Sequence, residues 1–208
     1  MDKTTLTVAS FEAVADAFER TFMDVTSYAP ALTSFEALLP VGARVLDLGC
    51  GPGNVARFLL GRRPDLKITG IDLSPGMIER FRKNAPGAEA MVMDLRQVGT
   101  LPPGWDAAVA SFCLPFFDHA EAAAFLQALG DLVIPGGHLY LSTMQGNTHG
   151  IEKTGFGGDR DFFFNYYQRT DLERLLTAAG FQVQFYREQP YHEQNGPDLV
   201  DMIIIARR

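Results

Sequence analysis

The chain has 208 residues, 47% of them hydrophobic, which fits a folded globular protein and excludes a disordered one. Its 18 basic and 25 acidic residues give a net charge of −7, which repels a phosphate backbone and argues against nucleic acid as a partner. The sequence has neither the apolar run of a membrane span nor the pattern of a signal peptide. We therefore expect a single cytoplasmic domain over 1–208, with no membrane association, acting as a monomer or homodimer.

Apolar runs alternate with helical periods along the chain, as is typical of parallel α/β folds. One or two amphipathic helices are predicted within 10–39, and 1–40 is expected to form a helical lid. Further helices are predicted at 53–62, 75–84, 119–132 and 171–179, and strands at 44–48, 67–72, 88–93, 105–112, 138–144, 181–188 and 199–206. The fold class expected is therefore α/β: a Rossmann-like, doubly wound sheet of seven strands, mostly parallel with an antiparallel last strand, and helices on both faces.

Capping residues mark several of these helix ends. Ser74 before Pro75, Asp118 with Glu121 in a capping box, and Thr170 are predicted N-caps. Gly180 is predicted to close the helix at 171–179 in a left-handed conformation.

A glycine-rich turn at 47–53 (DLGCGPG) follows the first predicted strand and precedes a helix. Gly49 and Gly51 can adopt positive φ and let backbone N–H groups approach a ligand. Gly53, without a side chain, lets the backbone pass directly from the turn into the helix. Asp72 ends the second strand 19 residues beyond Gly53, where a carboxylate can accept hydrogen bonds from both ribose hydroxyls. This arrangement predicts a nucleoside-binding site at the carboxyl edge of the sheet.

Together with Asp94 at the end of the third strand, these residues resemble the class I S-adenosylmethionine-dependent methyltransferase family. The matching pieces are VLDLGCGPG at 45–53, GIDLSPGMI at 70–78, MDL at 93–95, WDAAVASF at 105–112 and IPGGHLYLST at 134–143. The resemblance implies S-adenosylmethionine as methyl donor and S-adenosylhomocysteine as product. It places the methionine part of the donor on Asp47, Gly49, Cys50, Gly51 and Gly53, the ribose on Asp72, the adenine on Leu73, Met77, Asp94 and Leu95, and the sulfonium region on Ser111 and Phe112.

The N-terminal segment also resembles the family's lid helix, with Phe11 and Phe18 where tyrosines are common. Tyr28 is expected to supply the missing hydroxyl contact to the donor's carboxylate, and Phe11 to cover the site. Segment 145–169 is long for a connection inside a compact domain, so we expect an insertion that covers the acceptor. Within it, His149 or Tyr166 is the candidate to assist deprotonation, and 162–164 (FFF) forms either core or acceptor-pocket wall.

A sulfonium is an activated methyl donor, so holding the nucleophile in line matters more than any shared catalytic residue. The motifs therefore predict the donor and leave the acceptor open. Two observations favour a small-molecule acceptor. These are the acidic charge and 113–116 (CLPF), which differs from the tetrapeptide of amino-methylating DNA enzymes.

The alternatives are a nucleoside-binding module or sensor without transfer, and a nicotinamide-dependent oxidoreductase, which Asn54 disfavours because a dinucleotide turn has glycine there. No metal is expected, because the two cysteines and four histidines lack metal-ligand spacing. Cys50 and Cys113 are expected to be inert buried thiols that lie close together.

Overall fold

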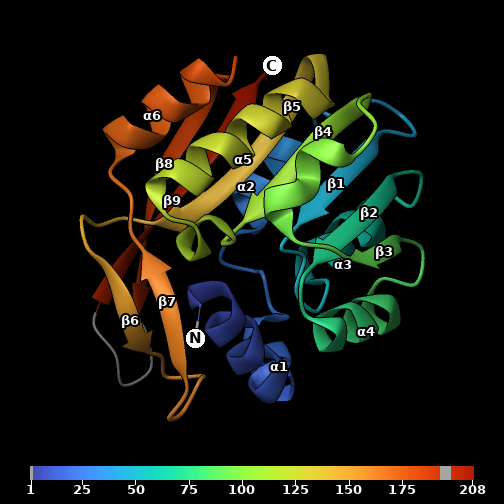
Figure 1. Cartoon of the computed structure of the whole chain (residues 1–208). Helices are drawn as coiled ribbons and strands as arrows, with labels where there is room; N and C mark the ends of the chain where they lie inside the picture. The colour runs from blue at the N-terminus through green and yellow to red at the C-terminus, as the bar shows by residue number, and fades with distance from the viewer. Residues whose placement is uncertain (1, 193–197) are drawn as a thin grey trace.

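The computed structural model describes residues 2–192 and 198–208 and centres on a seven-stranded sheet of order β3-β2-β1-β4-β5-β9-β8 (Figure 1). The strands β1 to β5 pair in parallel, whereas β9 runs antiparallel to both β5 and β8. Their bounds are β1 Arg44–Leu48, β2 Lys67–Asp72, β3 Glu89–Val92, β4 Trp105–Ser111, β5 Val133–Met144, β8 Gln182–His192 and β9 Asp198–Arg207. The predicted doubly wound sheet is confirmed, with the strand order reversing between β1 and β4.

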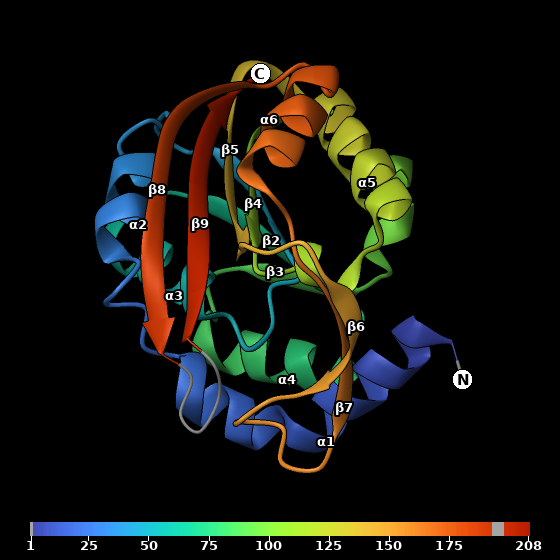
Figure 2. The same cartoon turned by 90° about the vertical axis from the view of Figure 1, so that its left-hand side faces the viewer.

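Helices cover both faces of this sheet (Figure 2). Alternate residues of a strand point to opposite faces, so Val45 of β1 belongs to one core and Leu46 to the other. Helices α2 (Ala29–Glu36), α3 (Asn54–Arg62) and α4 (Pro75–Asn84) pack on the Val45 side, and α5 (His119–Leu132) and α6 (Arg169–Ala178) on the Leu46 side. Two short 3₁₀ helices, η1 (Leu95–Thr100) and η2 (Leu114–Phe116), follow β3 and β4.

Local capping chemistry sets several of the helix ends. Ser74 Oγ accepts from the backbone N–H of Met77, Asp118 and Glu121 form the predicted capping box, and Gly180 has φ +81°. The Thr170 cap is wrong, because α6 already begins at Arg169 and Gln168 is its N-cap, without a side-chain cap. Gln168 has an extended backbone, and the N–H of Tyr167 before it donates to the O of Met144 at the end of β5.

Segment 145–169, which was expected to be a long covering loop, contains a β-hairpin of β6 (His149–Lys153) and β7 (Asp161–Asn165). Phe162 and Phe164 are buried on either side of the half-buried Phe163, as a period of two predicts, and Asn165 after them is also buried. Helix α1 (Lys3–Phe22) packs against β7: Ser10 Oγ donates to Asp161 O (2.7 Å).

Helix α1 and the hairpin therefore lie together across the carboxyl edge of the sheet (Figures 1 and 2). Within residues 2–192 and 198–208, no helix is both long and apolar enough to cross a bilayer.

Candidate donor and acceptor site

A cavity of about 310 Å³ lies at the carboxyl edge of the sheet, lined by α1, the ends of β1, β2 and β4, and the β6–β7 hairpin. Of the residues expected to contact the donor, all but Gly53 line it: Phe11, Tyr28, Asp47, Gly49, Cys50, Gly51, Asp72, Leu73, Met77, Asp94, Leu95, Ser111 and Phe112. The fold thus brings together residues that lie as much as 101 positions apart, from Phe11 to Phe112. The glycine turn, Asp72 and Asp94 therefore all border the space that a single ligand would occupy.

The glycine turn after β1 needs glycine at each of its three positions. Gly49, Gly51 and Gly53 have φ values of +64°, +51° and +89°, a region that residues with a Cβ rarely adopt. A Cβ on Gly49 would lie 2.6 Å from the Cβ of Cys113, and one on Gly53 would lie 3.0 Å from the ring of Phe81. Gly53 therefore serves the turn as the N-cap of α3 and not as part of the cavity wall.

The carboxylate of Asp72 is held by the backbone at the end of β2. Its Oδ2 accepts from the N–H of Gly51 (2.9 Å) and its Oδ1 accepts from the N–H of Ser74 (2.9 Å). Burial raises the pKa of Asp72, although these backbone hydrogen bonds oppose the shift. The carboxylate is therefore oriented before any ligand arrives, as a ribose-binding acid requires.

Asp47, the penultimate residue of β1, is a buried acid of the cavity. Burial, together with the neighbouring Asp72, raises the pKa of Asp47 to about 7. Its Oδ2 is buried and has no hydrogen-bond partner among the described residues. Because buried acceptors are normally paired, this oxygen fits the N–H groups of the amino-acid part of S-adenosylmethionine.

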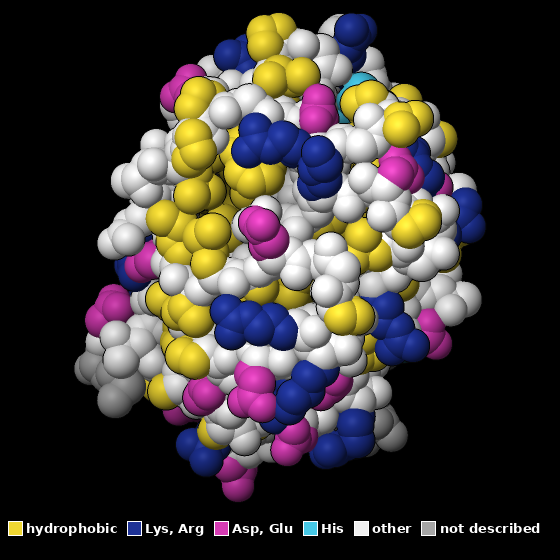
Figure 3. Space-filling model, turned by 90° about the vertical axis from the view of Figure 1, so that its right-hand side faces the viewer, with side chains coloured by type: hydrophobic (Ala, Val, Ile, Leu, Met, Phe, Trp, Pro, Cys, Tyr) yellow, Lys and Arg dark blue, Asp and Glu magenta, His cyan; other side chains and the backbone are white. Residues whose placement is uncertain are grey.

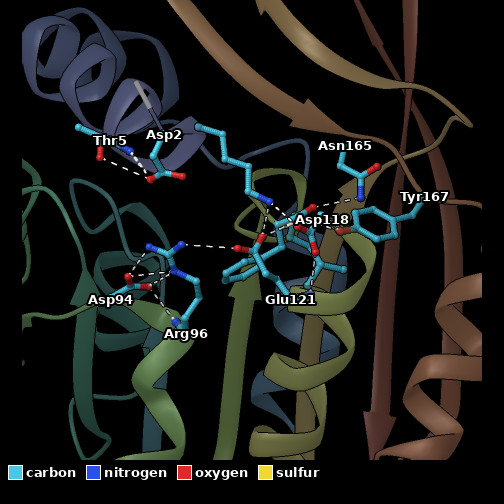
Figure 4. Close-up of polar contacts among 11 residues, drawn as sticks. Asp2, Thr5, Asp94, Arg96, Asp118, Glu121, Asn165 and Tyr167 are labelled. Atoms are coloured by element: carbon cyan, nitrogen blue, oxygen red, sulfur yellow. Dashed lines mark hydrogen bonds and ion pairs between the residues drawn. The ribbon is translucent and has the colours of Figure 1, made fainter.

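Asp94 and Arg96 form a close pair at the opposite end of the donor site, beyond β3 (Figure 4). Arg96 Nη2 donates to Asp94 Oδ2 (2.6 Å), and Arg96 Nη1 lies 3.5 Å from Glu121. Partial burial would raise the pKa of Asp94, but the hydrogen bonds and charge of Arg96 outweigh it and lower that pKa. Asp94 thus remains a carboxylate that can accept from an adenine amine.

Phe112, directly after β4, has an unusual backbone. Its φ is +54°, the left-handed region, which costs a non-glycine residue free energy and is often found at functional sites. The conformation is held by a hydrogen bond from the Phe112 N–H to Ser142 O (2.9 Å). The ring of Tyr28 meets the ring of Phe112 edge to face at 5.5 Å. This part of the cavity corresponds to the sulfonium region of the resemblance.

The far end of the cavity is aromatic and contains two tyrosine–carboxylate pairs that the sequence did not reveal. Tyr28 Oη donates to Asp201 Oδ2 (2.6 Å), and Tyr166 Oη donates to Glu152 Oε2 (2.8 Å). The donated proton of Tyr28 is thus engaged by Asp201, so its expected contact to the donor's carboxylate has a competing partner. The surrounding rings belong to Phe11, Phe18, Phe22, Phe116, Phe156 and Phe164.

Among the two candidate deprotonating residues, Tyr166 lines the cavity and His149 does not. His149 is exposed on β6, opposite Asn165. The run 162–164 was expected to form either core or acceptor-pocket wall, and it forms both. Phe162 is fully buried core and Phe164 lines the cavity.

Cys50 and Cys113 are free, buried thiols on either side of Gly49. Burial raises the pKa of both, which keeps them protonated and unreactive. Among the described residues, no three His, Cys, Asp or Glu side chains group as metal ligands would.

Comparisons with known proteins place the chain in a family. A model described as a methyltransferase domain matches residues 19–184. A trans-aconitate 2-methyltransferase of Methylobacterium nodulans is 39% identical over 101 residues, which cover 49% of this chain and 38% of that protein. A carboxy-S-adenosyl-L-methionine synthase of Chromohalobacter salexigens is 36% identical over 115 residues, covering 51% of this chain and 42% of that protein. The chain therefore spans about two fifths of these curated relatives.

Among solved structures, magnesium protoporphyrin IX methyltransferase from Synechocystis PCC 6803 with bound S-adenosylhomocysteine superposes with a TM-score of 0.74. It is 20% identical and the match covers 100% of both chains, so it shows the fold alone. The matched residues 19–184 contain the glycine turn, Asp72, Asp94 and Phe112, which the structure gathers around one cavity. The chain belongs to the methyltransferase domain family and has the Rossmann-like fold of the class I S-adenosylmethionine-dependent methyltransferases.

Proposed function

We propose that the chain transfers a methyl group from S-adenosylmethionine to a small-molecule acceptor. The observation that carries the proposal is the convergence of the glycine turn, Asp72 and Asp94 on a cavity that continues into an aromatic chamber. Bound there, S-adenosylmethionine supplies an electrophilic methyl group. Asp72 would hold the ribose, Asp47 would accept from the amino group, and the rings around Phe112 would exclude water from the methyl group.

The lid expected over 1–40 and the insertion expected over 145–169 are part of this proposal. Helix α1 contributes Phe11 and Phe18 to the cavity, and the hairpin contributes Glu152 and Phe164. A ligand enclosed by both segments would be shielded from water, which strengthens the electrostatic interactions around it. The two segments must therefore part for ligand exchange.

Calorimetry with S-adenosylhomocysteine tests the donor site. The variant Asp72→Asn keeps one acceptor oxygen but loses the charge, and we expect binding weaker by about 1 to 3 kcal/mol, the usual cost of losing charge-assisted hydrogen bonds. Asp131→Asn is the matched control, because Asp131 is exposed on α5 and lies outside the cavity. Equal affinities for Asp72→Asn and the control would remove Asp72 from the site.

Labelled methyl donor incubated with pools of small metabolites distinguishes transfer from binding alone. Transfer of label supports the enzyme, whereas tight binding of S-adenosylhomocysteine without transfer to any pool would identify a nucleoside-binding module or sensor. Saturable binding of a reduced nicotinamide dinucleotide would favour an oxidoreductase. Asn54 argues against that outcome, since its side chain donates to Phe22 O (2.9 Å) at the end of α1 and occupies the turn.

We propose further that the chain forms one domain and works in the cytoplasm, as a monomer or homodimer, without a nucleic-acid partner. The net charge of −7 supports the last point, as does the face shown in Figure 3, where basic and acidic side chains are interspersed. Light scattering would give the oligomeric state. Binding to duplex DNA at low salt would contradict the proposal that nucleic acid is not a partner.

A further inference from the structure

Phenylalanine rings on three separate elements wall the cavity beyond the donor residues. The ring of Phe11 on α1 lies 5.1 Å from that of Phe116 in η2, edge to face, and 6.2 Å from that of Phe156 in the hairpin, stacked. Phe116 in turn lies 5.6 Å from Phe164 on β7. Such walls favour a flat apolar body, or a cation, over a hydrated anion.

The charged side chains of the chamber are mostly acidic. Apart from the acids expected to hold the donor, the acidic residues that line the cavity are Asp24, Glu152 and Asp201, and Lys153 is the basic residue of its hairpin wall. Lys153 is itself 3.5 Å from Asp159 and its side chain is 56% exposed. Recognition of several carboxylates normally requires unpaired Arg or Lys side chains. Arg96, the other basic residue that lines the cavity, is paired with Asp94 and Glu121. Among the described residues, the cavity thus offers little free positive charge for a polycarboxylate such as trans-aconitate, the compound in the name of one relative.

Asp201 is the most buried of these acids, with 2% of its surface exposed. Its Oδ2 accepts from Tyr28 (2.6 Å), whereas its Oδ1 accepts no hydrogen bond from the residues that the structure describes. Oδ1 is therefore free to accept a hydrogen bond from a ligand. Since Asp201 lines the cavity, a hydroxyl or amino group of the methyl acceptor can reach that oxygen and donate a hydrogen bond to it.

Strand register places Asp201 beside the sulfonium region. Ser111, at the end of β4, pairs with Ser142 of β5, and Asp201 of β9 pairs with Met144, two residues further along β5. Tyr28 joins the two positions, because its hydroxyl bonds to Asp201 while its ring packs on Phe112. A group bonded to Asp201 would thus lie close to the transferred methyl.

We infer that the acceptor is a flat, uncharged or cationic aromatic compound with a hydroxyl or amino group, and that Asp201, positioned by Tyr28, binds that group and accepts its proton. The inference rests on the proposed function. The lone pair of the acceptor oxygen or nitrogen forms the new bond to the methyl carbon. The carbon–sulfur bond breaks with its electrons kept by sulfur, and the acceptor's proton passes to Asp201 Oδ1. The products are the methylated acceptor, S-adenosylhomocysteine and a protonated Asp201, which returns its proton to water.

The acid–base properties of Asp201 agree with this role. Burial raises the pKa of Asp201 to about 6, near the value that suits a general base at neutral pH. The titratable groups that face it are Tyr28, the N-cap residue of α2, Tyr140 of β5 and, close to Tyr28, Tyr191 of β8. Tyrosines stay neutral through this pH range, so Asp201 sets the acidic limb of the pH profile of kcat/KM. We expect kcat/KM to fall below about pH 6, because Asp201 is then protonated.

The test measures methyl transfer to simple phenols, to anilines and to trans-aconitate, alongside calorimetry with S-adenosylhomocysteine. We expect transfer to a phenol or an aniline and none to trans-aconitate, and the separate phenol and aniline arms identify the reacting group. Asp201→Asn should lower kcat/KM by about 10²- to 10⁴-fold and remove the acidic limb, while the Kd for S-adenosylhomocysteine stays within about threefold. Asp198→Asn, an exposed acid on the same strand, is the control and should behave as wild type.

Several outcomes would overturn the inference while S-adenosylhomocysteine still binds. These are comparable or faster methylation of trans-aconitate, no transfer to any phenol or aniline, or an Asp201→Asn variant with activity near that of wild type. Should Asp201→Asn fail to fold, Tyr28→Phe is the deciding variant. We expect it to lower kcat/KM by roughly five- to tenfold. An unchanged kcat/KM would count against Asp201 as the residue that accepts the proton. A wild-type chain that does not bind S-adenosylhomocysteine would instead overturn the proposed function, and this inference with it.

Discussion

The ammonium of Lys3, in the first turn of the proposed lid helix α1, lies 2.6 Å from the carboxylate of Glu121 in the first turn of α5. Glu121 is labelled in Figure 4. Lys3 also contacts Asp118 (2.6 Å), and Glu121 lies 3.5 Å from Arg96, the partner of Asp94. A chain of charges thus runs from the lid to the expected adenine-binding acid. We expect the closed position of α1 to depend on it.

Lys3→Ala should loosen the lid with little loss of global stability. Its ion pairs are partly exposed, so the free energy of unfolding should fall by about 0.5 to 1 kcal/mol, and by less at high salt. Dissociation of S-adenosylhomocysteine should become faster in stopped-flow measurements. Lys83→Ala removes an exposed pair with Glu79 on α4 and is the control. Equal dissociation rates in the two variants would show that the Lys3 pairs do not hold the lid.

Gly49→Ala should damage the glycine turn. The new Cβ would lie 2.6 Å from the Cβ of Cys113, at a φ that disfavours alanine, so we expect a loss of about 2 to 3 kcal/mol in urea unfolding and at least tenfold weaker binding of S-adenosylhomocysteine.

Gly61→Ala is the matched glycine substitution. Gly61 lies in α3 with no atom within 4 Å of the added Cβ, so its replacement should stabilise the protein by about 0.5 to 1 kcal/mol. A Gly49→Ala protein as stable as wild type would contradict the tight packing of the turn.

Asp201 should make stability depend on pH. Its pKa in the folded protein, about 6, lies above its usual 3.8, so the folded state binds a proton more tightly than the unfolded state. This contribution is fully present below about pH 4 and is lost as pH rises to about 6. Relative to wild type, Asp201→Asn should therefore gain up to about 3 kcal/mol in unfolding free energy between pH 4 and pH 7. A constant difference across that range, measured by urea unfolding, would refute the raised pKa.

The hairpin residues His149 and Tyr166 should differ in their effects on transfer. His149 is exposed outside the cavity, so His149→Ala should leave kcat/KM for the phenol or aniline that accepts the methyl group within about twofold of wild type. Tyr166→Phe removes the hydroxyl that donates to Glu152 in the cavity wall, and KM for the acceptor should rise by roughly fivefold. Loss of activity in His149→Ala would restore it as the deprotonating residue.

The sequence by itself determined the part of the cavity that we propose binds the donor, because that part is built from local conformation. Strands β1 and β2 have the bounds that their apolar runs predicted, and Ser74 and Asp118 cap the helices expected of them. The glycines of the turn adopt the positive φ that their spacing indicated. Each of these features depends on residues a few positions apart, so a linear pattern contains the necessary information.

The acceptor half was decided only by the tertiary structure. Tyr28 and Asp201 are 173 positions apart, and they meet because β9 inserts antiparallel between β5 and β8. In sequence, Asp201 is merely an acid at the start of an apolar strand. Likewise, Phe156 and Phe164 face the cavity because the hairpin folds against α1, a contact that depends on packing between distant segments rather than on any local propensity. Local backbone chemistry thus specifies the proposed donor site, and the strand order and register specify which side chains lie beside it.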